Sequence, residues 1–141
     1  MTGKVFVFSL TFIAAVMDYR SMRISNRVIL AGLAMGVIYD LLTGGKEMLR
    51  YGLLGMLIPL VMLFAFFVLR LLGAADIKLF SVLGMFMGPV SIIRCMFYSF
   101  VFGALFAIIK LVISRKENDR RIIRFAIPIF LSVLLYVGGF Y

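Results

Sequence analysis

Two acidic residues of this chain lie where hydrophobic runs meet short basic stretches. Asp18 follows the first apolar run, and Asp76 directly precedes a later one. A carboxylate near a bilayer costs free energy, so each acid needs a structural or functional reason. If the helices bring Asp18 and Asp76 together, their partly sheltered carboxyl groups can share one proton. Such a pair can activate a water molecule to hydrolyse a peptide bond.

The other acids lie in surroundings that we interpret as solvated. They are Asp40, Glu47, Glu117 and Asp119. The first two lie beside a glycine-rich turn, and the last two belong to the charged stretch 114–124. Only Asp18 and Asp76 combine an acid with a membrane-length segment and a distinctive local motif.

A purely structural interpretation of Asp18 and Asp76 remains open on spacing alone. An acid at the start of a helix often caps it, so Asp76 could accept hydrogen bonds from free backbone N–H groups. Asp18 could instead form an ion pair with Arg20 or Arg23 at the membrane interface.

The composition of the chain indicates an integral membrane protein. It is 65% hydrophobic and 15% charged, contains neither His nor Trp, and has a mean hydropathy of +1.17. A water-soluble surface cannot be built from such a chain, so we expect an all-α, polytopic membrane protein. Residues 1–141 leave room for a single domain. The single cysteine, Cys95, forms no internal disulfide or metal cluster and is expected to be buried, and we expect no metal and no cofactor.

About six apolar runs predict six transmembrane helices. They are, approximately, Val5 to Met17, Val28 to Leu42, Tyr51 to Leu69, Leu79 to Ile93, Cys95 to Ile113 and Phe125 to Tyr141. Breaks with turn or interface character are expected at 43–47, 72–75, 88–89 and 114–124. The first run could be a signal peptide, but no small-residue cleavage site follows it, so we interpret it as a mature helix.

The basic residues predict the orientation of these helices. The net charge of +9 would suggest nucleic acid in a soluble protein, but here the basic residues fall at segment ends, so we expect no nucleic-acid partner. They are densest after the first run, before the fourth and before the sixth. The positive-inside rule makes these three connections cytoplasmic and puts both termini outside. Asp18 and Asp76 then lie at the same face and at similar depth, at the inner edge of the membrane.

Two short motifs resemble the type IV prepilin peptidases, a family of membrane aspartic proteases. The residues that carry the resemblance are Asp18, Arg20, Ile24 and Asn26 in the first motif and Gly73, Ala75, Asp76 and Lys78 in the second. The chain is most similar to the short members that serve tight-adherence or Flp-type pili and lack a methyltransferase domain. The archaeal preflagellin peptidases are similar as well.

The resemblance implies that Asp18 and Asp76 are catalytic. It also implies a substrate, a prepilin or pseudopilin precursor with a short basic leader and a hydrophobic helix, cut just before that helix at the cytoplasmic face of the cell membrane. The remaining motif residues have supporting roles. Asn26 could fix the turn after the first helix through side-chain to backbone hydrogen bonds, while Lys78 and Arg20 could anchor helices at lipid headgroups. The family pattern has glycine where this chain has Ala75, and alanine disfavours a left-handed backbone there.

Two other classes remain consistent with the acids. A small transporter or channel could bind protons or cations at membrane-edge aspartates. A non-catalytic component of a pilus or secretion apparatus would need the helices alone. An internal inverted repeat, or acids at the bilayer midplane, would favour transport, and we find neither in the sequence.

Overall fold

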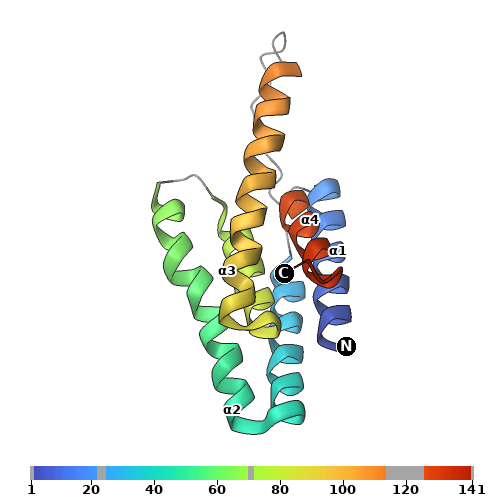
Figure 1. Ribbon diagram of the computed structural model, residues 1–141, viewed down its shortest axis with the longest axis vertical. Helices are drawn as coiled ribbons and strands as arrows, with labels where there is room; N and C mark the ends of the chain where they lie inside the picture. Colours follow the sequence, from blue (N-terminus) through green and yellow to red (C-terminus); the bar gives the residue numbers. More distant parts are fainter. Residues whose placement is uncertain (1, 22–24, 70–71, 114–125, 141) are drawn as a thin grey trace.

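The computed structural model describes residues 2–21, 25–69, 72–113 and 126–140. Within these ranges the chain forms four helices: α1 (Thr2–Ser21), α2 (Asn26–Val68), α3 (Ala74–Ile113) and α4 (Ala126–Val137). The described residues contain no strand, so the expected all-α class is confirmed. Figure 1 shows α1 and α4 side by side, with the longer α2 and α3 making up the rest of the bundle.

Each of the two long helices is broken once, at a glycine. The break is at Gly45 in α2 (φ 62°, ψ −146°) and at Gly88 in α3 (φ 77°, ψ 173°). A positive φ is accessible to glycine without the steric cost that a side chain would add. Figure 1 shows α2 and α3 doubling back at these points, so each helix is a hairpin of two segments.

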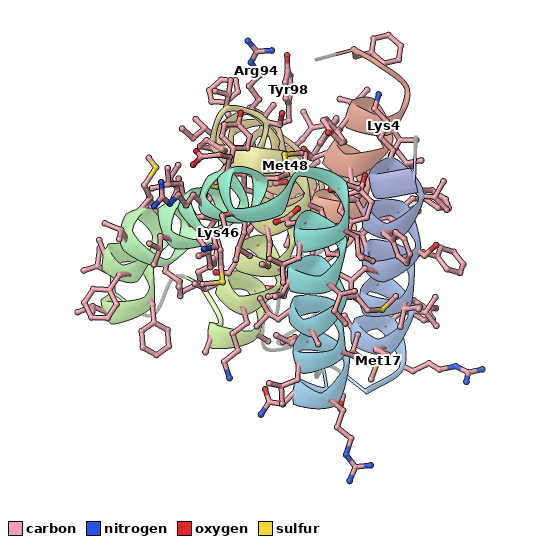
Figure 2. All side chains as sticks on the ribbon, turned by 90° about the horizontal axis from the view of Figure 1, so that it is seen from below. Lys4, Met17, Lys46, Met48, Arg94 and Tyr98 are labelled. Carbon is pink, nitrogen blue, oxygen red and sulfur yellow. The ribbon has the colours of Figure 1, made fainter. Side chains whose placement is uncertain are left out.

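The two breaks test the predicted run boundaries. The turns expected at 43–47 and 88–89 are confirmed at Gly45 and Gly88. The bounds of the run predicted from Leu79 to Ile93 are wrong, because the first segment of α3 ends at Gly88 and the five residues after it belong to the next segment. Arg94, which lies between two predicted runs, is inside the helix with its side chain exposed (Figure 2).

The first segment of α3 is the centre of the bundle. Its side chains are almost all buried between 79 and 88, and the fully buried ones include Phe80, Val82 and Leu83. α2 makes its most extensive contact with α3, while α1 packs on α4 and α3 and only lightly on α2. In the α1–α4 contact, the ring centroids of Phe8 and Phe130 are 5.7 Å apart.

Glycines let the α2 and α3 hairpins approach backbone to backbone. A methyl group on Gly55 would collide with the carbonyl of Gly84, and one on Gly84 would collide with the carbonyl of Gly55. Pro59 lacks an N–H group, so the carbonyl of Gly55 has no helical donor four residues later and is free to face α3. Such close contacts of small residues are typical of helix pairs in membranes.

Buried hydroxyl groups in the core donate to backbone carbonyls. Ser99 and Ser132 both donate to the carbonyl of Cys95, at 2.7 and 2.8 Å, and the second of these bonds joins α4 to α3. Cys95 itself is a fully buried free cysteine, as expected from the sequence.

Large apolar side chains cover much of the outer surface. Val61, Phe64 and Val68 in α2 and Phe97 and Val112 in α3 are each more than half exposed. Two helices, Asn26–Val68 and Ala74–Lys110, are long and apolar enough to cross a membrane. Exposure of this kind suits lipid as the surrounding solvent rather than water.

Candidate active site

Asp18 lies near the end of α1, one turn before the helix stops at Ser21. Its side chain is half-buried, and its Oδ2 atom is screened from solvent. Tyr19 and Arg20, the next two residues, are exposed. The helix therefore turns the acid inward and its neighbours outward at the same level.

Asp76 lies in the first turn of α3 and is also half-buried. Its backbone N–H donates to the carbonyl of Gly73 at 3.1 Å, and the N–H of Gly73 donates back to its carboxylate. This reciprocal pair satisfies donors at a helix start, as in a capping box. The capping interpretation of Asp76 is therefore confirmed. The capping bond also fixes where the carboxylate lies.

The structure brings Asp18 and Asp76 near each other. The carboxylate of Asp76 interacts electrostatically with that of Asp18, although the two residues are on different helices and far apart in the sequence. α1 packs against α3, and this contact provides the approach. Two like charges at a partly sheltered position repel each other, and a shared proton relieves that repulsion.

A second contact joins the two motifs. The Nζ of Lys78 donates to the Oδ1 of Asn26 at 3.2 Å, between side chains that are both exposed. This bond ties the start of α2 to the first turn of α3. Ser25, the residue before Asn26, caps α2 and accepts a hydrogen bond from the N–H of Arg27 at 3.3 Å. The turn that Asn26 was expected to fix includes residues 22–24, which lie outside the described ranges, so this role stays a prediction.

Ala75 has helical backbone angles within α3. Alanine is well suited to this conformation, so the substitution of glycine by alanine creates no strain here. Its side chain packs against the hydrophobic core. Gly73 has no positive φ, and a methyl group there would lie 3.2 Å from the carboxylate of Asp76.

Some predicted residues lie outside the described ranges. They are Ile24, Arg23, Glu117 and Asp119. Among the residues that the structure describes, no three His, Cys, Asp or Glu side chains gather as metal ligands would.

The prediction that Asp40 is solvated is wrong. This acid lies in the first segment of α2 and is only 2% exposed. It follows Gly32 and Gly36 at four-residue spacing, and all three positions are buried on one helix face. The four-residue spacing from Gly32 and Gly36 was the sequence signal that Asp40 is buried, and the nearby glycine-rich turn obscured it.

The described helices form a bundle with an apolar surface, and two carboxyl groups lie at one end of it. These features are those of a helical membrane protein with a pair of acids. The chain belongs to the type IV leader peptidase family, because the model of that family matches residues 5–108. The matched region contains both Asp18 and Asp76 and ends before α4. No curated protein and no solved structure matches the chain. The membership makes this protein a membrane protease of the leader peptidase kind.

Proposed function

We propose that the protein is a membrane aspartic endopeptidase that cleaves the leader peptides of type IV prepilin-like, Flp-type precursors. In this proposal Asp18 and Asp76 activate the water molecule. The observation that carries it is the electrostatic interaction between these two carboxyl groups, which come from different helices to one end of the bundle. Membership in the leader peptidase family supports the reaction class.

The mechanism needs one proton shared between the two acids. The ionised carboxylate accepts a proton from water, while the protonated partner donates a hydrogen bond to the carbonyl of the scissile bond. Water then adds to the carbonyl carbon, and the carboxyl groups return a proton to the leaving amine as the C–N bond breaks. Asp18 and Asp76 act as a unit, so either could hold the proton at a given step.

The depth of the pair follows from the length of the helix that Asp76 begins. Residues 74–87 rise about 21 Å as a helix, which is less than the roughly 30 Å of a hydrocarbon core. This length supports a position of Asp76 near the membrane edge rather than far out in water. The basic residues near this end assign that edge to the cytoplasm in our proposal.

A substrate with a hydrophobic helix would reach the pair from within the bilayer. The surface of α1 next to Asp18 suits such an approach, because Val16 and Tyr19 are exposed. A peptide bond inside a helix has its carbonyl engaged in an i to i+4 hydrogen bond. The cut therefore falls where the helix of the precursor unwinds, just before its hydrophobic segment.

The competing classes explain fewer observations. A transporter or channel would account for a buried acid such as Asp40 but not for the match to a peptidase family. A scaffold has no use for two acids held together at a free-energy cost. Neither class accounts for the family match.

The test is cleavage of an Flp-type prepilin from the same genome by the purified protein in detergent. We expect mass spectrometry to show loss of the leader just before the hydrophobic segment, and we expect the cut to persist in the presence of a metal chelator. A precursor that stays intact in lipid as well as in detergent would contradict the proposal.

A further inference from the structure

The buried Asp40 lies away from the proposed active site, near the Gly45 end of the bundle. Its Oδ2 has no hydrogen-bond partner among the described residues. The ion pair found within the described ranges joins Arg50 to Glu47 at 3.2 Å on the surface, and no Lys or Arg is paired with Asp40 there. An ionised carboxylate buried without a partner is very costly, so this acid requires a compensating interaction.

A backbone acceptor close to Asp40 also lacks its usual donor. In an unbroken helix the carbonyl of Met85 would accept from the N–H of residue 89, but Pro89 has no N–H. Gly88 also leaves the helical conformation at this point. The break in α3 therefore leaves the carbonyl of Met85 available for another donor.

The carboxyl group of Asp40 and the carbonyl of Met85 both lie next to Gly52. A methyl group on Gly52 would collide with the Oδ2 of Asp40 and would lie 3.0 Å from the carbonyl oxygen of Met85. The three residues belong to three segments: the first and second halves of α2 and the first half of α3. Both polar groups therefore lie against the same small residue in the interior.

We propose that Asp40 forms a second carboxyl site that binds a proton and donates its O–H group to the carbonyl of Met85. A neutral carboxylic acid avoids the cost of a buried charge and supplies the donor that Pro89 cannot. The bond joins the α2 hairpin to the α3 hairpin near their turns. It is independent of peptide hydrolysis, so it stands or falls apart from the proposed function.

The cations at this end of the bundle are engaged elsewhere or lie on the surface. On α1, the ammonium of Lys4 lies 5.3 Å from the centroid of the Tyr136 ring on α4. On α2, Arg50 pairs with Glu47, and the side chains of Lys46 on α2 and Arg94 on α3 are exposed. The tyrosines of α2 are neutral donors, and their rings pack on Phe6 and Phe86 in the case of Tyr39 and against Gly88 in the case of Tyr51. The compensation for Asp40 is therefore a proton rather than an ammonium or guanidinium group.

Infrared difference spectroscopy tests the protonation state directly. The spectrum of the wild-type protein minus that of Asp40→Asn should show the carbonyl band of a protonated carboxylic acid. A carboxylate band in that difference spectrum would overturn the proposal.

Thermal unfolding tests the hydrogen bond. Asp40→Asn keeps an N–H donor of similar size and should unfold close to the wild-type temperature, whereas Asp40→Leu removes the donor and should unfold roughly 4 °C lower or more. Glu47→Gln is the matched surface control and should have no effect. Equal unfolding temperatures for the Asn and Leu variants would overturn the proposal, as would a wild-type stability that rises with sodium, potassium or calcium, since that dependence would indicate a bound cation.

Discussion

The three aspartates Asp18, Asp76 and Asp40 have different surroundings. Asp76 begins a helix and receives the N–H of Gly73, whereas Asp18 ends a helix one turn from its last residue. Asp40 shares the residue type but is enclosed by other segments at the far end. All three residues are aspartates, so the differences in their chemistry come from where each lies in its helix.

The sequence motifs select the candidate residues of the site but do not show how the two motifs meet. Asp18 and Asp76 could be selected as candidates because each joins an acid to a helix boundary. The hydrogen bond from Lys78 to Asn26 could not be predicted from the sequence, because it joins residues 52 positions apart and depends on how α2 and α3 pack. The Ser25 cap could have been predicted, since serine before an apolar run is a common helix start.

The Asn26–Lys78 bond should couple the two motifs energetically. We expect Asn26→Ala and Lys78→Met each to lower the free energy of unfolding by about 1 kcal/mol or less, because the bond is exposed. Their effects should be non-additive, because either change alone removes the same bond. A double-mutant cycle of unfolding and of precursor cleavage measures this coupling. Additive effects in both assays would show that the contact has no role in holding the motifs together.

At the scale of the elements, the described helices are joined by the α2–α3 hairpin packing, the α1–α4 aromatic contact, the packing of α1 on α3 and the Ser132 bond from α4 to α3. Helix content could be predicted from apolar run length, and the Gly45 turn from its Gly-Gly pair. The turn at Gly88 could be predicted from the Gly-Pro pair at 88–89. The bounds of the run that crosses it were misplaced, because the composition is equally apolar on both sides of the break.

The backbone contact between Gly55 and Gly84 should be intolerant of a single methyl group. We expect Gly84→Ala to lower the free energy of unfolding by about 1–3 kcal/mol, because the added carbon meets a backbone carbonyl that cannot move independently. The measurement is chemical unfolding in detergent. Gly3→Ala is the matched control, since its methyl group would meet only the Tyr39 side chain at 3.2 Å. Equal stability of Gly84→Ala and Gly3→Ala would contradict the described packing.

At the scale of the whole molecule, an apolar surface surrounds a small buried core centred on the first half of α3. The two hairpin turns of α2 and α3 belong to one end, and Asp18 and Asp76 belong to the other. Composition alone predicted a membrane protein, because too few polar residues are present to cover a soluble surface. The distribution of basic residues along the chain predicts the orientation of the helices in the membrane, and this orientation is a proposal.

The proposed orientation can be tested with the cysteine that the chain already has. Cys95 is the only cysteine and is fully buried, so it should not react with a membrane-impermeant maleimide in intact cells. Lys46→Cys should be labelled from outside, whereas Glu117→Cys should be labelled only after the cells are opened. The reverse pattern would contradict the cytoplasmic position of Asp18 and Asp76.

The measurement that tests the central claim most directly is the cleavage rate of Asp18→Asn, Asp76→Asn and the double variant, with Asp40→Asn as a matched control. If the two acids act as a unit, each single variant should lose about 10³-fold or more in rate, and the double variant should be no slower than the slower single one. Asp40→Asn should cleave at the wild-type rate. A single variant at Asp18 or Asp76 that folds and cleaves at the wild-type rate would show that these acids are not the catalytic pair.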